Sequence, residues 1–257
     1  MSEDLVSLKI LLVSEAAAER ETIRRAASQA SVPIEVVEIE ATEDVTPASD
    51  QLAKENFDAV FFDSRLSRQA RQAVIDAARA AKSHPLAILI GAAEMKTRVV
   101  LTDGLAVDGA LAKPIDLGEA RTLLDGCVRA RLSRRALIVD DSATVRSVVR
   151  KVLDASRFRF EAEEAEQGQQ AIEKAGSQHF DIVFLDVNMP VLDGFATLAE
   201  LQRSHPDTDV VMITSSNDPT LADRAKQAGA KALLFKPFYV KDIDKLTSQL
   251  LGLVRSA

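Results

Sequence analysis

Residues 181–190 read DIVFLDVNMP, a short apolar run that ends on a carboxylate. The four apolar residues at 182–185 have the length and β-branched character of a strand covered on both faces, as in a parallel sheet flanked by helices. Asn188 and Pro190 indicate that a loop follows, because proline cannot continue a strand ladder. An isolated aspartate here would more simply cap a turn. Asp186 is nevertheless expected at the carboxyl end of a strand, where open α/β sheets bind their ligands.

The composition describes a globular chain that is long enough for two domains. It has 257 residues, of which 47% are hydrophobic and 28% charged, and its mean hydropathy is +0.00. At this length two hydrophobic cores are expected. No apolar run has the length of a membrane span, and the N-terminus MSEDLVSLKI lacks the basic segment and long apolar core of a signal peptide. We therefore expect a cytoplasmic protein without membrane insertion.

The charge and the metal-binding residue types exclude several classes of function. A net charge of -7 and a pI of about 5.2 argue against direct binding of nucleic acid, which relies on basic surface. The basic stretch of Arg129, Arg131, Arg134 and Arg135 is more simply a helix end and a linker. One cysteine, Cys127, and three scattered histidines exclude a disulfide framework and a zinc-like cluster. Chemistry based on oxygen ligands remains.

Two landmarks recur at one offset, which indicates an internal repeat. The strand-ending aspartates Asp63, in FDAVFFD, and Asp186, in FDIVFLD, are 123 residues apart. Lys113 and Lys236, each followed by proline after an apolar strand, are also 123 residues apart. Strand and helix patterns alternate in both halves, and this alternation is typical of parallel sheets. The sequence therefore predicts an α/β chain of two doubly wound (βα)5 domains, each with a five-stranded parallel sheet.

The predicted domain boundaries are 7–132 and 135–257. A helix over about 117–132 runs into the next strand through only SRR, without a spacer rich in glycine or proline, so we expect the two domains to be coupled. The last helix pattern, KDIDKLTSQLLGLVRSA, occupies 241–257. We expect no separate output domain after it.

Further polar residues end strands of the second domain and are predicted to share one sheet edge with Asp186. They are Asp140 and Asp141 after the first strand, Thr214 at the end of the fourth and Lys236 at the end of the fifth. Each pair of like charges costs about 4 kcal/mol at ~4 Å and an effective dielectric near 20, which a divalent cation removes. Oxygen ligands suit Mg²⁺, which keeps several waters and binds phosphate. Such an edge suits phosphoryl transfer, with Asp186 as nucleophile and Lys236 neutralising charge.

The segments LIVDDSATVR, DIVFLDVNMPVLDG, ITSS and FKPF stand in this order between residues 135 and 255. In this combination they resemble the response-regulator receiver family, CheY-like proteins with a flavodoxin-like fold. The resemblance implies that Asp186 is the site of phosphorylation. It also implies metal ligation by Asp140, Asp141, Asp186 and the backbone carbonyl of Asn188, with Thr214 and Lys236 contacting the phosphoryl group. A cis Lys236–Pro237 bond is implied too, whereas Leu233 replaces the aromatic residue that usually takes part in the switch.

The first copy keeps the strand pattern and loses much of this site. The residues at the corresponding places are Ser14, Glu15, Asp63, Arg65, Gly91 and Lys113. Their formal charges sum to zero, against -2 for the three carboxylates and one lysine of the second copy. Arg65 either pairs with Asp63 in the electrostatic place of a metal or points into solvent. In both cases we expect poor Mg²⁺ binding and a degenerate pseudo-receiver that acts as an adaptor or dimerisation domain.

The predicted function is that of a two-component response regulator rather than an enzyme with a separate substrate. Its second domain accepts a phosphoryl group from phosphohistidine and catalyses only its own phosphorylation and dephosphorylation. The expected partners are a sensor histidine kinase or a histidine phosphotransfer protein, a downstream protein that the sequence does not identify, and a second copy in a homodimer. The signal leaves through protein contacts or onward phosphotransfer. The alternative is a Mg²⁺-dependent phosphatase of the haloacid-dehalogenase kind, which needs a second aspartate where this chain has Asn188.

Overall fold

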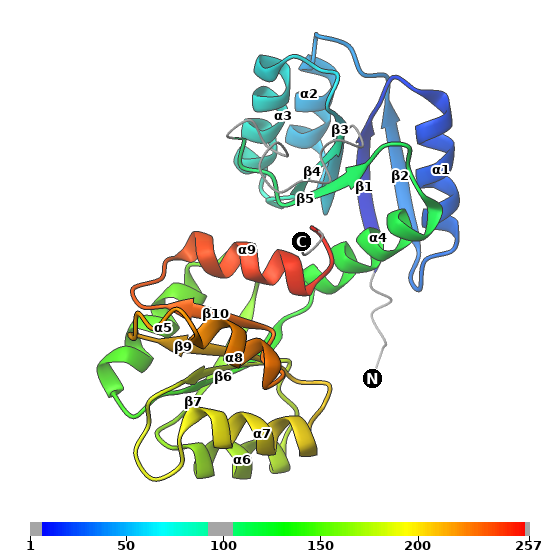
Figure 1. Cartoon of the computed structure of the whole chain (residues 1–257). Helices are drawn as coiled ribbons and strands as arrows, with labels where there is room; N and C mark the ends of the chain where they lie inside the picture. Colours follow the sequence, from blue (N-terminus) through cyan, green and yellow to red (C-terminus); the bar gives the residue numbers. More distant parts are fainter. Residues whose placement is uncertain (1–6, 92–104, 255–257) are drawn as a thin grey trace. The chain divides into compact units, whose positions relative to one another are not determined.

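The computed structural model describes residues 7–91 and 105–254, which form two five-stranded parallel sheets with helices between the strands (Figure 1). The described residues divide into two compact units, one running from 132 to 247 and the other containing those up to Arg131 together with those from Ser248 onward. We call these the second and the first domain. The predicted fold class of two doubly wound domains is confirmed. Among the described helices, none is long and apolar enough to cross a bilayer.

The sheet of the first domain has the strand order β2-β1-β3-β4-β5. Helices α1 and α4 pack beside each other, as do α2 and α3. A helix expected between the fourth and fifth strands falls on residues 92–104, outside the described part. The elements are β1 (Leu8–Val13), α1 (Ala17–Ser28), β2 (Ile34–Ile39), α2 (Thr46–Lys54), β3 (Ala59–Asp63), α3 (Arg68–Ala80), β4 (Leu86–Gly91), β5 (Gly109–Ala112) and α4 (Leu117–Arg131).

The sheet of the second domain repeats this order, read from the other edge as β10-β9-β8-β6-β7. Every strand pair in it is parallel, so all carboxyl ends meet at one edge. The elements are β6 (Arg134–Val139), α5 (Ala143–Asp154), β7 (Phe160–Ala165), α6 (Gly168–Ser177), β8 (Ile182–Asp186), α7 (Gly194–Ser204), β9 (Asp209–Thr214), α8 (Leu221–Gln227), β10 (Ala232–Phe235) and α9 (Val240–Leu250).

Strand β8 is apolar up to its last residue because helices cover both faces of the sheet. All five of its residues are buried. Val183 and Leu185 belong to the core under α6 and α7, which pack beside each other (Figure 1). Phe184 points to the opposite face, where its ring meets that of Phe160 edge-on with centroids 6.5 Å apart. The burial of four apolar residues on both faces therefore fixes Asp186 at the sheet edge.

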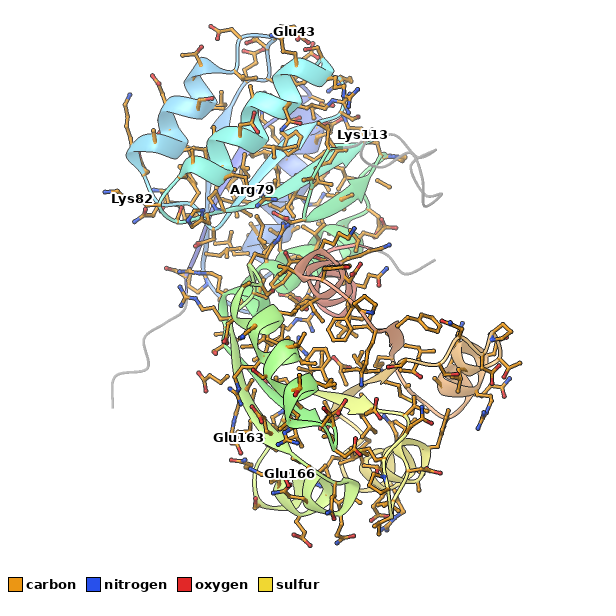
Figure 2. The ribbon with its side chains drawn as sticks, turned by 90° about the vertical axis from the view of Figure 1, so that its left-hand side faces the viewer. Glu43, Arg79, Lys82, Lys113, Glu163 and Glu166 are labelled. Atoms are coloured by element: carbon orange, nitrogen blue, oxygen red, sulfur yellow. The ribbon has the colours of Figure 1, made fainter. Side chains whose placement is uncertain are left out.

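The outer strand β7 is polar where β8 is apolar. Its sequence FEAEEA places Glu161, Glu163 and Glu164 on an edge that only one neighbouring strand covers. Glu163, which is labelled in Figure 2, accepts hydrogen bonds from Lys174 at 2.9 Å and from Gln178 at 2.7 Å. Charged side chains on an edge strand disfavour pairing with the edge of another sheet.

One strand and one helix differ in their bounds from the sequence pattern. Strand β6 begins at Arg134, so residues 132–133 alone join α4 to β6. The last helix was expected over 241–257 but ends at Leu250, and Gly252 takes a φ of +75°, a conformation that favours glycine.

The residues after α9 complete the first domain. Leu253 is fully buried. Its carbonyl accepts a hydrogen bond from the amide of Ala110 on β5 at 3.0 Å, and the carbonyl of Leu251 accepts one from the Arg129 side chain of α4 at 2.9 Å. The compact unit therefore includes residues that the sequence assigns to the second domain.

Glycine at position 126 is required by this contact, because a Cβ there would lie 2.5 Å from the carbonyl oxygen of Leu251. We expect Gly126→Ala to destabilise the first domain by about 1–3 kcal/mol. Gly176→Ala is the matched helical control: its Cβ meets nothing within 4 Å, so it should stabilise by up to about 1 kcal/mol. Hydrogen exchange read by mass spectrometry separates the two domains. Unchanged protection of the first domain in Gly126→Ala would contradict the packing.

Candidate functional site

One ammonium group joins three strands at the carboxyl edge of the second sheet. Asp140 follows β6, Asp186 ends β8 and Lys236 follows β10. Nζ of Lys236 donates to Oδ2 of Asp140 at 2.6 Å and to Oδ1 of Asp186 at 2.7 Å. Both aspartates are buried, and the lysine side chain is only 17% exposed. The sequence placed these three residues at one edge, and the structure brings them into direct contact.

The loops after β6 and β8 hold their aspartates in the same way. The amide of Ser142 donates to Oδ1 of Asp140 at 2.9 Å, and the amide of Asn188 donates to Oδ2 of Asp186 at 2.9 Å. These are side-chain turns that orient each carboxylate with respect to its own backbone. Helix α5 is capped by the Ser142 hydroxyl, which accepts from the amide of Val145. Asp140 is therefore not the cap of this helix.

Gly194 is a positioning residue to which the sequence analysis gave no role. Its amide donates to the carbonyl of Val187 at 3.0 Å, which closes the loop after β8. A Cβ at this place would lie 2.2 Å from the backbone oxygen of Asp186. The Asp-Gly pair at 193–194 was the available signal, because glycine after a turn residue often marks a close approach of two backbone segments.

Burial and charge act against each other at this edge. Burial raises the pKa of Asp186 above its ordinary value, and the neighbouring Asp140 carboxylate adds to this, although hydrogen bonding to Lys236 opposes it. For Lys236, burial alone would lower the pKa, but the two carboxylates raise it overall. Lys236 is therefore a stable cation that holds two acids close together.

The remaining predicted residues surround this contact without joining it. Thr214 is fully buried at the end of β9, and its Oγ1 accepts from the amide of Ser216 at 3.0 Å. The carbonyl of Thr214 accepts from the amide of Lys236 at 2.7 Å, which ties β9 to the lysine. Asp141 and Asn188 have exposed side chains. A hollow of about 540 Å³ lies between the loops that carry Asn188 and Ser216.

The donor set of this edge fits a magnesium ion. Its ligands would be the carboxylates of Asp140, Asp141 and Asp186 and the backbone carbonyl of Asn188. All are hard oxygen ligands, and Mg²⁺ completes such a set with water. Within residues 7–91 and 105–254, no three acidic, histidine or cysteine side chains are already arranged as a metal site. A bound Mg²⁺ would share the carboxylates of Asp140 and Asp186 with Lys236, which now bridges them.

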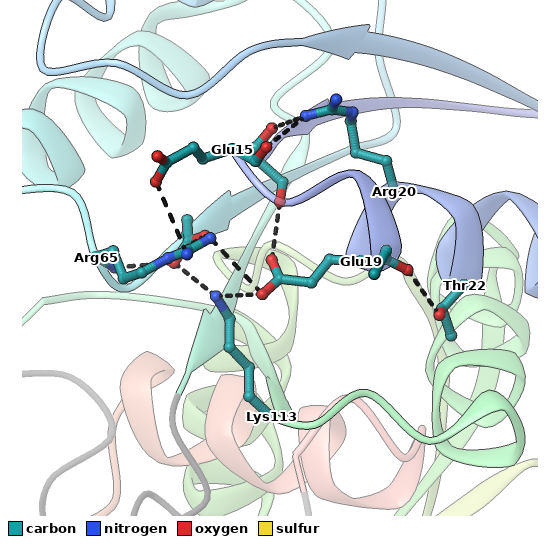
Figure 3. A network of polar contacts seen from close by, with 9 residues as sticks. Glu15, Glu19, Arg20, Thr22, Arg65 and Lys113 are labelled. Carbon is teal, nitrogen blue, oxygen red and sulfur yellow. Dashed lines mark hydrogen bonds and ion pairs between the residues drawn. The ribbon is translucent and has the colours of Figure 1, made fainter.

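The corresponding edge of the first domain is occupied by two cations (Figure 3). Nζ of Lys113 donates to Oδ1 of Asp63 at 2.8 Å and also contacts Glu19 at 2.8 Å. Arg65 donates to Oδ2 of Asp63 from Nε at 3.1 Å and from Nη2 at 2.6 Å. Of the two alternatives for Arg65, pairing with the aspartate is therefore correct, even though its side chain is 50% exposed.

Glu19 is a member of this cluster that the sequence analysis missed. It accepts a hydrogen bond from the Ser14 hydroxyl at 2.8 Å and lies 3.7 Å from Arg65. Glu19 is the second carboxylate in contact with Lys113, as Asp140 is the second carboxylate in contact with Lys236. With Glu19 included, the formal net charge of the cluster is one unit more negative than the predicted zero. The signal was weak, since an acid in the first turn of a helix has a simpler explanation in the helix dipole.

The two strand-end aspartates differ in the direction of their pKa shifts. For Asp63, burial is opposed by hydrogen bonds from Arg65 and Lys113, and together these lower its pKa below the ordinary value. Asp186 has Lys236 as its one cationic partner among the described residues. The effect of burial is then larger than that of the lysine, and the pKa of Asp186 is raised. The first domain therefore holds its aspartate as a fully paired anion.

With the fold and this geometry established, comparison with known proteins identifies the family. The family described as Response regulator receiver domain matches residues 136–248. The chemotaxis protein CheY of Bacillus subtilis is 36% identical over 107 residues, which are 42% of this chain and 88% of CheY. The transcriptional regulatory protein PdtaR of Mycobacterium tuberculosis is 35% identical over 114 residues, 44% of this chain and 55% of PdtaR. The chain belongs to the response-regulator receiver family.

The tandem arrangement also has a counterpart among solved structures. One titled "Structure of probable two-component system response regulator/GGDEF domain protein" covers 95% of this chain and 99% of its own, with a TM-score of 0.53 and 19% identity. At this identity the likeness shows the fold of two receiver-like domains. Both domains contain a cis Lys-Pro bond, Lys113–Pro114 and Lys236–Pro237, and the second was predicted. Leu233 packs against the apolar core.

Replacing Arg65 tests the pairing in the first domain. Arg65→Gln should raise the pKa of Asp63, because burial would then be opposed only by Lys113 and by the backbone amide of residue 65, without the guanidinium. A depressed carboxyl pKa contributes stability above about pH 4 that is lost as the pH falls through the folded value. The variant should therefore be less stable than the wild type at pH 7, and the difference should shrink below about pH 4.

The measurement is an NMR titration of the Asp63 carboxyl carbon together with unfolding at several pH values. Arg68→Gln, an exposed arginine three residues further on, is the control and should leave the Asp63 titration in place. An Asp63 pKa that stays the same in Arg65→Gln would show that the guanidinium does not hold this carboxylate in solution.

Proposed function

We propose that the second domain accepts a phosphoryl group on Asp186 in a Mg²⁺-dependent reaction, from a phosphohistidine on a sensor kinase or a phosphotransfer protein. The observation that carries the proposal is the contact of Lys236 with both Asp140 and Asp186. A lysine held by two carboxylates at a sheet edge keeps positive charge beside the nucleophile, as phosphoryl transfer requires. Membership in the receiver family supports the same function, and nothing in the described geometry favours the phosphatase alternative.

In this reaction a carboxylate oxygen of Asp186 attacks phosphorus, the bond from phosphorus to the histidine nitrogen breaks, and an acyl phosphate forms. Asp140, Asp141, Asp186 and the carbonyl of Asn188 would hold Mg²⁺, which supplies positive charge next to the phosphoryl oxygens. Lys236 keeps its ammonium at the same edge and pairs with the transferred group. The hydroxyl of Thr214, at the end of the neighbouring strand, supplies a hydrogen-bond donor to a phosphoryl oxygen.

The first domain is proposed to be an adaptor that does not accept phosphoryl groups. Both oxygens of its Asp63 carboxylate are engaged, one by Lys113 and the other by Arg65. It has Gly91 where the second domain has Thr214, and Ser14 where the second has Asp140. The domain therefore keeps a folded receiver surface without a reactive site, and the signal passes through protein contacts or onward phosphotransfer from Asp186.

Chemical trapping tests which aspartate reacts. With acetyl phosphate and Mg²⁺, we expect modification at Asp186 alone, because its carboxylate pairs with one cation through one oxygen, whereas both oxygens of Asp63 pair with cations. Borohydride reduction of the acyl phosphate followed by mass spectrometry locates the modified residue. Asp186→Asn should abolish the label and Asp63→Asn should retain it. Substantial label on Asp63 would overturn the adaptor role and make the chain a receiver pair with two inputs.

Magnesium binding should likewise be confined to the second domain. Asp141→Ala should weaken it by at least about tenfold, the loss that even supporting partners of metal ligands produce. Glu15→Ala, at the corresponding place in the first domain, is the matched control and should leave the affinity unchanged. Calorimetry on the full chain gives both the affinity and the stoichiometry. Two comparable sites, or equal affinities in both variants, would show that the ligands are assigned wrongly.

A further inference from the structure

Arg146 is a buried arginine that binds the loop carrying the acidic pair. It lies in α5, is 6% exposed, and follows Asp141 by five residues. Its Nη1 donates to the backbone carbonyl of Asp140 at 2.9 Å and, at the long distance of 3.5 Å, to that of Asp141. A charged donor to a buried carbonyl is among the stronger hydrogen bonds in proteins. The contact therefore restrains the backbone of both residues that carry the carboxylates.

The other two nitrogens of the same guanidinium are fixed by glutamates of the neighbouring strand. Nε donates to Glu164 of β7 at 3.0 Å, and Nη2 donates to Glu166, just after β7, at 3.0 Å. All three nitrogens are thus engaged, on the β6–α5 loop and on the β7 side of the sheet. A planar, fully bonded guanidinium has little freedom to move. The loop is consequently held against α5 and the end of β7.

The first domain contains the same arrangement without the acidic pair. Nη1 of Arg20 donates to the carbonyl of Ser14 at 2.6 Å and to that of Glu15 at 3.0 Å (Figure 3). Its Nε lies 3.4 Å from Glu38. Arg20 and Glu38 each stand 126 residues before Arg146 and Glu164, as Ser14 stands before Asp140. Loop shape is therefore common to both domains, whereas only the second loop carries two aspartates.

We propose that Arg146 is a positioning residue for the Mg²⁺ site. It makes no hydrogen bond to the side chain of any predicted ligand within the described residues, and it acts through the backbone of Asp140 and Asp141. By restraining that backbone it keeps the two carboxylates at the sheet edge before the ion binds, as partners of metal ligands commonly do. This inference rests on the proposed function of the second domain.

The test measures Mg²⁺ affinity of the full chain by calorimetry and by the NMR shifts of the β6–α5 loop. Arg146→Gln should raise the Kd by about 10–100-fold. The rate of labelling of Asp186 should fall at low Mg²⁺ and recover at saturating Mg²⁺, because the ligands themselves remain. Arg146→Lys keeps the positive charge but loses the planar guanidinium that donates from three nitrogens. Its Kd for Mg²⁺ should therefore lie between those of Arg146→Gln and the wild type.

Arg20→Gln is the matched control, since it breaks the same loop contact in the first domain and should leave the Kd for Mg²⁺ unchanged. If Arg146→Gln unfolds the second domain, Glu166→Gln serves in its place, because it removes one anchor of the guanidinium and should weaken Mg²⁺ binding several-fold. A folded Arg146→Gln or Glu166→Gln variant that binds Mg²⁺ within twofold of wild type overturns the positioning role. Failure of the wild type to bind Mg²⁺ overturns the proposed function as well.

Discussion

The ammonium of Lys236, held between two buried carboxylates, is the interaction on which the proposed chemistry of the second domain depends. It joins Asp140 after β6, Asp186 at the end of β8 and Lys236 after β10; β6 and β8 are neighbouring strands, and β9 separates β8 from β10. These residues meet because all strands of the sheet are parallel, which brings their carboxyl ends to one edge. Two acids this close are tolerable because the cation between them is itself mostly buried, where water screens charge least. The doubly wound fold thus creates the site by bringing strand ends to one edge, and the apolar strands hold them there.

The first domain shows what the same fold does when the charge balance changes. Its lysine keeps its place, but Glu19 on a helix replaces the missing carboxylate and Arg65 takes the other oxygen of Asp63. The cluster is then satisfied by protein groups alone, and the aspartate becomes a structural anion with a lowered pKa. In the second domain the aspartate has one cation and a raised pKa. A difference of a few side chains at one sheet edge therefore separates a cluster that protein groups satisfy from the one that we propose to accept a phosphoryl group.

Much of this could be predicted from the sequence because the apolar strands are short and most of them end on a polar residue or are followed directly by one, such as Asp63, Asp140, Asp186 and Lys236. The repeat of Asp63 and Lys113 at Asp186 and Lys236 fixed the fold of both halves. Contacts between side chains distant in sequence were harder to predict: Glu19 has an ordinary role as a first-turn acid, and only the structure shows it bridged to Lys113. Helix α9 ends before Leu253 because Leu253 packs in the first domain. The spacing of hydrophobic residues in the sequence does not predict such a tertiary contact. The sequence places Arg146 in a helix but does not indicate its contact with the loop that carries Asp140 and Asp141.

The most direct test of the account is to give the first site the residues of the second. The variant that combines Ser14→Asp, Glu15→Asp, Arg65→Asn and Gly91→Thr carries the acidic pair, the hydroxyl and a strand-end aspartate without its arginine. After treatment with acetyl phosphate and Mg²⁺, mass spectrometry measures the modification of Asp63 and of Asp186 in the same chain. We predict that Asp63 is unmodified in the wild type and modified in this variant, with Asp186 modified in both. A folded variant whose Asp63 stays unmodified, or a wild type in which Asp63 already reacts, would contradict it.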